Sequence, residues 1–188
     1  MLKHPERISY NDLQEAINNL PTHEKQIATL AYATGARVSE LIQIRKQDIQ
    51  ITKNTPDYLT ITCPVLKKNR KPKDPLKRLA WKKRNHERIA LVRLSESWLV
   101  EPIQQRCNEL VNPSDVLVPL NRFKVYRILN KIVVNNEPIN PHGFRHLRAT
   151  HLRKNFGFDP YQLQMFFGWA TIEPSSFYVG LDTQEIEY

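Results

Sequence analysis

The length and composition of the chain are those of one ordinary folded domain. It has 188 residues, of which 40% are hydrophobic and 25% are charged. The longest apolar runs fall far short of the roughly 20 residues that a membrane-spanning helix needs, and the polar start MLKHPERISYNDLQ is not a secretory signal. Two cysteines, Cys63 and Cys107, are too few for a disulfide framework and fit a reducing compartment. We therefore expect a soluble cytoplasmic protein, and we exclude the membrane-spanning and disulfide-rich secreted classes.

The net charge of +9 is concentrated in one segment. Between Lys67 and Arg88 there are 11 lysines and arginines against 2 acidic residues, so the rest of the chain, with 17 of each, is neutral. Such a dense basic block is either a solvated loop or a contact surface for a polyanion. We favour the polyanion, and nucleic acid in particular.

The first third of the chain predicts three helices. Ser9 precedes the amphipathic run LQEAINNL, with Asp12 at the capping-box distance from it. A second helix should begin near Pro21 and end at Gly35, because glycine commonly ends helices. A third should begin at Val38 and continue through SELIQIRK.

The middle of the chain predicts a hairpin and two further helices. The β-rich runs 58–66 and 87–94 flank the basic block and form an antiparallel hairpin with a long charged tip. Ser95 opens a helix through SWLVEPIQQRCNEL, Asn121 caps one through RFKVYRILNKIVV, and NNEPINP is a polar connection.

The last third predicts helices again, the first being PHGFRHLRATHLRKNFG over residues 141–157. After the turn at Gly157, YQLQMFFGW forms a short helix and Glu173-Pro174 starts the last one. The predicted fold is therefore mostly α with a small antiparallel β-sheet, an α+β class.

Charged and aromatic side chains single out three places for chemistry. The spacing of three puts His142 and Arg145 on one face of a helix, near the amide-rich first turn that favours a phosphate. His146 and His151 follow, but HGFRH lacks the glutamate of the metalloprotease motif, so we predict no metal.

The other two places are TGARVSEL, residues 34–41, and the segment GWATIEPSSFYVG. In the first, Arg37 lies in a tight junction between helices, where it suits bidentate phosphate binding and Glu40 can orient it. In the second, Tyr178 follows a proline-initiated turn, and we expect it to be exposed. Taken singly, each of these features has an ordinary structural explanation.

Taken in order, these features resemble the catalytic domain of the tyrosine recombinases, or phage-type integrases. The signature of that family is Arg, Lys, His-x-x-Arg, His or Trp, and Tyr. The chain offers Arg37, a lysine-rich hairpin, His142-x-x-Arg145, Trp169 and, nine residues later, Tyr178. The resemblance covers nearly the whole chain and includes RxSEL and HGFRHxxAT. It implies the recombinase catalytic-domain fold.

The resemblance also implies roles for these residues. Tyr178 would be the nucleophile that attacks a DNA phosphate and forms a 3′-phosphotyrosyl bond. Arg37 and Arg145 would hold the non-bridging oxygens, and His142 would contact the phosphate and assist proton transfer around the tyrosine. Trp169 would pack against the phosphate or the tyrosine. No metal or cofactor would be needed.

Further positions are assigned by the same resemblance. Glu40 would support the pocket and His146 would stand behind it. The general acid would be a hairpin lysine, with Lys67 preferred, Lys68 next, and Lys71 or a lysine near Arg84 left open. The charged hairpin tip would hold the DNA backbone through Lys71, Lys73, Lys82, Lys83 and Arg84. Three charges of the 141–157 helix should face solvent or DNA, namely Arg148, Arg153 and Lys154.

The resulting expectation is a site-specific recombinase that cleaves and rejoins double-stranded DNA with other protomers, as a dimer or tetramer on DNA. We expect residues 1–188 to be a single catalytic domain without the N-terminal core-binding domain of the family, associated with the nucleoid. The alternatives are type IB topoisomerase-like relaxation and a catalytically idle DNA-binding regulator.

Overall fold

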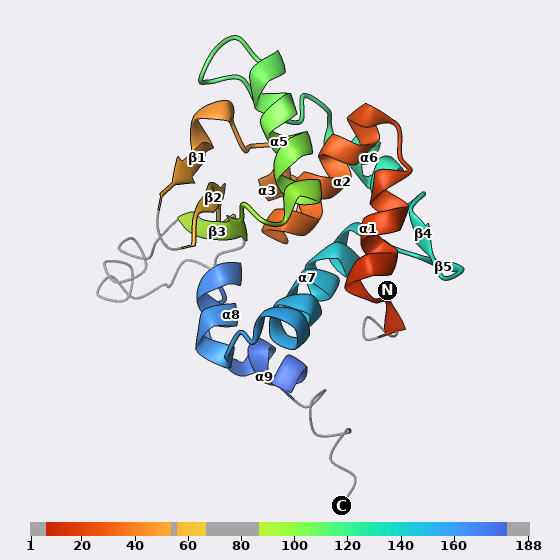
Figure 1. Cartoon of the computed structure of the whole chain (residues 1–188), viewed down its shortest axis with the longest axis vertical. Coiled ribbons are helices and arrows are strands. Elements are labelled where there is room, and N and C mark those ends of the chain that lie inside the picture. Colours follow the sequence, from red (N-terminus) through yellow and green to blue (C-terminus); the bar gives the residue numbers. More distant parts are fainter. Residues whose placement is uncertain (1–6, 54–55, 67–86, 180–188) are drawn as a thin grey trace, which may run out of the picture.

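Helices dominate the structure, a computed structural model that describes residues 7–53, 56–66 and 87–179 (Figure 1). The helices are α1 (Tyr10–Asn18), α2 (Thr22–Thr34), α3 (Val38–Leu41), the 3₁₀ helix η2 (Lys46–Asp48), α5 (Ser97–Glu109), α6 (Arg122–Leu129), α7 (Pro141–Phe156), α8 (Pro160–Phe167) and α9 (Glu173–Val179). The strands are β1 (Ile49–Thr52), β2 (Tyr58–Pro64), β3 (Glu87–Arg93), β4 (Val133–Val134) and β5 (Glu137–Pro138). The predicted α+β class is confirmed. None of the helices in the described ranges has the length and hydropathy that a bilayer crossing requires.

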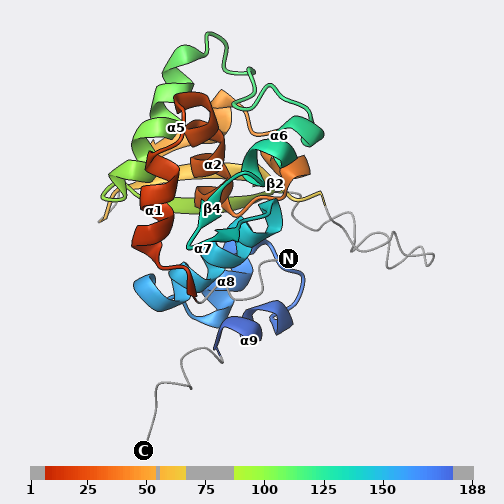
Figure 2. The same ribbon diagram turned by 90° about the vertical axis from the view of Figure 1, so that its right-hand side faces the viewer.

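Helix α2 lies at the centre of the fold, because every residue from 26 to 34 is buried. It packs against α5 and α7, and also against α1 and α6 (Figures 1 and 2). The predicted start of α1 is confirmed, since Ser9 Oγ accepts a hydrogen bond from the backbone of Asp12 at 3.1 Å. The predicted end of α2 at Gly35 is also confirmed.

The predicted hairpin is present as β2 and β3, and β1 extends it to a three-stranded antiparallel sheet. Side chains of β3 alternate in burial, and Arg88 pairs with Cys63 on the buried face. Ile89 and Leu91 point the other way and are 55% and 40% exposed. The sheet therefore turns an arginine toward the helices and two aliphatic side chains toward solvent.

Two connections differ from the prediction. The third helix ends at Leu41 rather than at Lys46, because the next residues pair with the loop before α6: Leu117 donates its backbone N–H to Ile44 at 2.9 Å. The helix predicted through RFKVYRILNKIVV ends at Leu129, and its last two residues, Val133–Val134, are strand β4 instead. They pair with β5 in the β4–β5 hairpin, since Asn135 and Asn136 adopt the positive φ angles of a tight turn, 51° and 63°.

Arg148 was predicted to face solvent or DNA, and this prediction is wrong. Its side chain is fully buried, and its guanidinium lies 3.0 Å from Glu96 and over the ring of Tyr32. His151, which follows on the same helix, is hydrogen-bonded between the Tyr32 hydroxyl and the Ile8 carbonyl at 2.7 and 2.8 Å. One face of α7 is thus a polar and aromatic part of the core.

Replacing Arg148 by Met should destabilise the fold, because the Glu96 carboxylate would stay buried without its cation. We expect the free energy of unfolding to fall by about 3–5 kcal/mol, measured by urea unfolding. Lys154→Met is the matched control, since Lys154 is exposed on the same helix, and should change it by less than about 0.5 kcal/mol. Equal, small effects of both variants would contradict the buried pair.

Candidate active site

The candidate site is built where the C-terminal ends of α2 and α8 meet. Each helix ends at a glycine in the left-handed conformation, Gly35 at φ 55° and Gly168 at φ 61°. A Cβ atom on Gly35 would lie 2.4 Å from the ring of Phe167, so the ends of the two helices approach at a distance that only glycine permits. The last carbonyls of both helices are left without partners inside their own helices.

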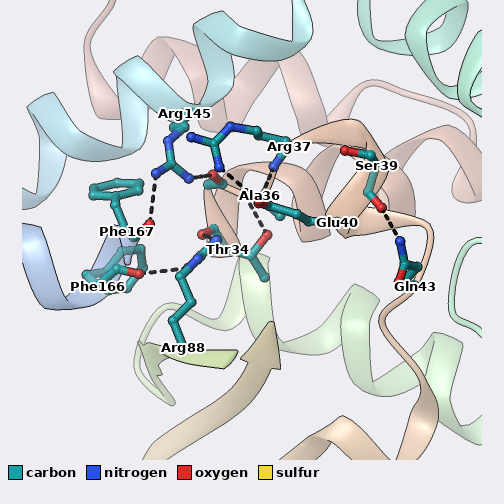
Figure 3. A network of polar contacts seen from close by, with 11 residues as sticks. Thr34, Ala36, Arg37, Ser39, Glu40, Gln43, Arg88, Arg145, Phe166 and Phe167 are labelled. Atoms are coloured by element: carbon teal, nitrogen blue, oxygen red, sulfur yellow. Dashed lines mark hydrogen bonds and ion pairs between the residues drawn. The ribbon is translucent and has the colours of Figure 1, made fainter. Parts of the chain in front are cut away.

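Arg145 of α7 binds both helix ends. Its two terminal nitrogens donate to the carbonyl oxygens of Gly35 and Phe167 at 2.7 and 2.8 Å (Figure 3). Its guanidinium also lies over the Phe167 ring, 4.7 Å from the centroid. A cation at helix C-termini is favoured because the helix dipoles end there in partial negative charge. The predicted phosphate-binding arginine is therefore held by backbone on one side.

Arg88 of β3 binds the same two helix ends, at the carbonyls one residue before those that Arg145 binds. Its terminal nitrogens donate to the carbonyls of Phe166 and Thr34 at 2.7 and 2.8 Å (Figure 3). The sequence placed Arg88 within the basic block and assigned it no part in the site. Two arginines thus bond two consecutive carbonyls of each helix end.

Arg37 is held next to this pair by Glu40. The Glu40 carboxylate accepts from the Arg37 backbone N–H at 2.9 Å and from its guanidinium at 2.8 Å. Glu40 is almost completely buried, whereas the Arg37 side chain is 31% exposed. The predicted orienting role of Glu40 fits this geometry, and the Arg37 guanidinium stays accessible to a ligand.

Positive charge accumulates at this point of the molecule. Burial and the neighbouring charges of Arg88 and Arg37 lower the pKa of Arg145 from its ordinary value, and Glu40 only partly opposes them. Charged arginines in such proximity repel one another. An anion bound between Arg37 and Arg145 would relieve that repulsion.

Tyr178 of α9 is buried, and the expectation of an exposed tyrosine is wrong. Its side chain is 4% exposed because it stacks on Trp169, with the rings 4° from parallel, and Trp169 in turn stacks on Phe167. Burial raises the pKa of the Tyr178 hydroxyl to about 12. Trp169 therefore packs against the predicted nucleophile through its ring face.

His146 contacts the Tyr178 hydroxyl directly. The Nδ1 atom of His146 lies 2.6 Å from the hydroxyl oxygen, and burial together with Arg145 lowers the pKa of the imidazole. A neutral imidazole at this distance can receive the phenol proton. His142, predicted for that task, is exposed and lies edge-on to His146, with the ring centroids 4.6 Å apart.

The predicted signature residues on described parts of the chain thus form one connected cluster, and two of them, Arg37 and Trp169, line an open groove. Arg37, Arg88 and Trp169 line this groove of about 1510 Å³, together with outward side chains of β3 such as Ile89. The predicted hairpin residues lie outside the described ranges: Lys67, Lys68, Lys71, Lys73, Lys82, Lys83 and Arg84.

Helix α6 carries exposed basic side chains that were assigned no role from the sequence. Arg122, Lys124 and Arg127 are exposed on it, beside the exposed aromatic rings of Phe123 and Tyr126. The helix packs against α3, whose first turn holds Arg37 in place. The sequence does carry a signal for this basic face, because apolar Val125 and Leu129 are four residues apart and the charged residues lie between and before them.

Known structures share this fold. The structure of the XerH site-specific recombinase bound to its palindromic difH substrate, a post-cleavage complex, matches with a TM-score of 0.63 and 20% identity over 98% of this chain and 52% of that one. The XerA recombinase structure matches with a TM-score of 0.64 and 18% identity, covering 96% of this chain and 65% of that chain. Over these parts the chain has the fold of those recombinases.

Sequence comparison gives the family. The model of the phage integrase family matches residues 6–185, so the chain belongs to that family. Tyrosine recombinase XerC of Anoxybacillus flavithermus is 30% identical over 95% of this chain, and XerD of Yersinia pestis is 28% identical over 89%. The chain spans about half the length of these curated relatives, 55% and 52%.

Sulfate should stabilise the folded chain by binding between the clustered arginines. At a concentration ten times its Kd it adds about 1.4 kcal/mol, or roughly 4 °C in Tm, relative to chloride at equal ionic strength. Arg37→Ala should lose most of this increment in thermal unfolding, whereas Lys124→Ala, a change on exposed α6, should keep it. An undiminished increment in Arg37→Ala would contradict an anion site here.

Proposed function

We propose that the chain is the catalytic part of a site-specific DNA recombinase, which cleaves and rejoins DNA strands through a 3′-phosphotyrosyl intermediate. The observation that carries this proposal is the position of the Tyr178 hydroxyl. It shares one cluster with Arg37 and Arg145, which are suited to bind a phosphate. Membership of the phage integrase family and similarity to proteins named tyrosine recombinases support the same conclusion.

In the cleavage step, the Tyr178 oxygen attacks the scissile phosphorus while its proton passes to Nδ1 of His146. The bond from phosphorus to the 5′ oxygen breaks, and that oxygen leaves as a hydroxyl after taking a proton from a general acid. The acid is assigned from the sequence to Lys67, with Lys68 as the second candidate. Rejoining reverses the step, because the phosphotyrosyl bond is itself a phosphate ester that the free 5′-hydroxyl can attack.

The arginines stabilise the charge that builds on the non-bridging oxygens during attack. Arg37 offers an accessible guanidinium, and Arg145 is fixed by the Gly35 and Phe167 carbonyls before DNA arrives. Donors fixed in advance cost no reorganisation during the reaction, and removal of one such donor commonly slows a reaction by roughly 100- to 1,000-fold. His142, which is exposed at the start of α7, would contact the phosphate as well.

The proposed partners are double-stranded DNA and further copies of the protein assembled on it. Basic side chains of α6 and of the segment 67–86 would contact DNA phosphates, which makes the affinity steeply dependent on salt. The proposed location is the cytoplasm, at the nucleoid, where the free thiols of Cys63 and Cys107 are in a reducing environment.

A trapping experiment tests the nucleophile. The protein is incubated with nicked suicide duplexes that carry a randomised target segment, so that cleavage releases a short fragment and the covalent adduct persists. Wild type should give a protein–DNA adduct on a denaturing gel, and peptide mass spectrometry should find the DNA on Tyr178. Tyr178→Phe should give none, because it lacks the attacking oxygen.

Tyr161→Phe is the matched control, since Tyr161 is an exposed tyrosine of neighbouring α8, and it should form the adduct like wild type. An adduct that persists in Tyr178→Phe would overturn the nucleophile assignment. If DNA is bound and no adduct forms with wild type, the outcome favours a DNA-binding regulator. Relaxation of supercoiled plasmid without strand exchange would instead favour a topoisomerase.

A further inference from the structure

Arg88 is a buried arginine without a place in the recombinase signature. It comes from an inward position of β3 and is 5% exposed. Both of its terminal nitrogens are used by backbone carbonyls, those of Thr34 and Phe166. Because it is buried, Arg88 is poorly suited to contact DNA phosphates, unlike the exposed arginines of α6. Its contacts are instead with the framework of the candidate site.

The two carbonyls that Arg88 binds precede two site residues at the same spacing. Thr34 lies three residues before Arg37, and Phe166 three residues before Trp169. Between each pair the chain turns through a left-handed glycine, so the position of the carbonyl fixes the direction in which the site residue leaves the helix. A Cβ atom on Gly168 would lie only 3.0 Å from Cδ of Arg88, so this turn is built against the arginine stem.

Arg88 also fixes the position of Arg145. Both arginines bond the same two helix ends, and Arg145 takes the next carbonyl on each side. If Arg88 were removed, Arg145 would be the one remaining arginine, within the described part of the chain, that bonds carbonyls of both helix ends. A helix end that moves carries with it the backbone oxygens that aim the Arg145 guanidinium (Figure 3).

We propose that Arg88 is a positioning residue of the cleavage site, which acts by holding Arg37 and Arg145 in the geometry that binds the scissile phosphate. This inference rests on the proposed recombinase function. The guanidinium shape is essential to it, because two divergent N–H groups bond two separate carbonyls at once. A lysine keeps the charge but presents a single ammonium on a flexible stem.

The test compares two variants on two substrates. Arg88→Lys keeps the charge, and Arg88→Met removes both charge and hydrogen bonds. Each is assayed on a suicide duplex of the sequence recovered from wild-type adducts, and on the same duplex with a neutral methylphosphonate at the cleaved position. The rate of adduct formation is measured in a single turnover at saturating DNA, and Kd is measured separately. Arg106→Met is the control, because Arg106 also bonds a carbonyl, that of Leu117, from the last turn of α5.

On the phosphate substrate, both Arg88 variants should slow adduct formation by roughly a hundredfold, the cost of misplacing a reacting group by about 1 Å. Their Kd for DNA should stay within about threefold of wild type, and Arg106→Met should react like wild type. On the methylphosphonate, the ratio of wild-type to variant rates should fall to within about threefold, because the charge that Arg37 and Arg145 neutralise is gone.

A general loss of folded structure would slow both substrates by the same factor, and that result would overturn the proposal. So would an Arg88→Lys variant that cleaves the phosphate substrate at the wild-type rate. Should Arg88→Met fail to fold, Arg88→Lys on the two substrates decides the question. Failure to recover any wild-type adduct in the trapping experiment that supplies this duplex would count against the recombinase function itself, which keeps the two failures distinct.

Discussion

The hydrogen bonds of Arg88 and Arg145 to the ends of α2 and α8 are the constraint on which the site depends. The two helices end at left-handed glycines, and their last carbonyl oxygens have no hydrogen-bond donor within their own helix. Two guanidinium groups satisfy four of these oxygens, those of residues 34, 35, 166 and 167. These hydrogen bonds fix the ends of both helices, and therefore the start of the segments that carry Arg37 and Trp169.

The positions of the other candidate site residues depend on this four-carbonyl junction between the ends of α2 and α8. Arg37 turns outward with Glu40 behind it, and Trp169 supplies the ring on which Tyr178 stacks. Tyr178 in turn reaches His146 on the same helix as Arg145. Helix α7 therefore has two different faces, because one carries Arg145 and His146 of the candidate site while the other is part of the core. The candidate site is held by backbone and ring contacts, and the proposed phosphate would reduce the repulsion among its arginines.

Local signals in the sequence predicted most of the framework, because caps and helix ends depend on neighbouring residues. Gly35 is an example. The order of the signature residues also indicated that Arg145, Trp169 and Tyr178 lie together, and these three side chains are in contact. Burial of charged and aromatic residues was not predictable in this way. The alternation in β3 offers either Arg88 or Ile89 to the core, and hydrophobicity favours the wrong one. Arg148 is buried because Glu96 and aromatic rings of distant segments meet it, and Tyr178 because Trp169 and His146 of other elements cover it.

The central claim is that the four-carbonyl junction presents a ready phosphate site to the Tyr178 hydroxyl. The most direct test is a crystal structure of the Tyr178→Phe chain bound to its uncleaved DNA. We predict that one backbone phosphate contacts both Arg37 and Arg145, with the substituted ring still stacked on Trp169 and the carbonyl bonds of Arg88 and Arg145 unchanged. A phosphate bound elsewhere, or a junction whose carbonyl bonds are broken when DNA is bound, would contradict the account.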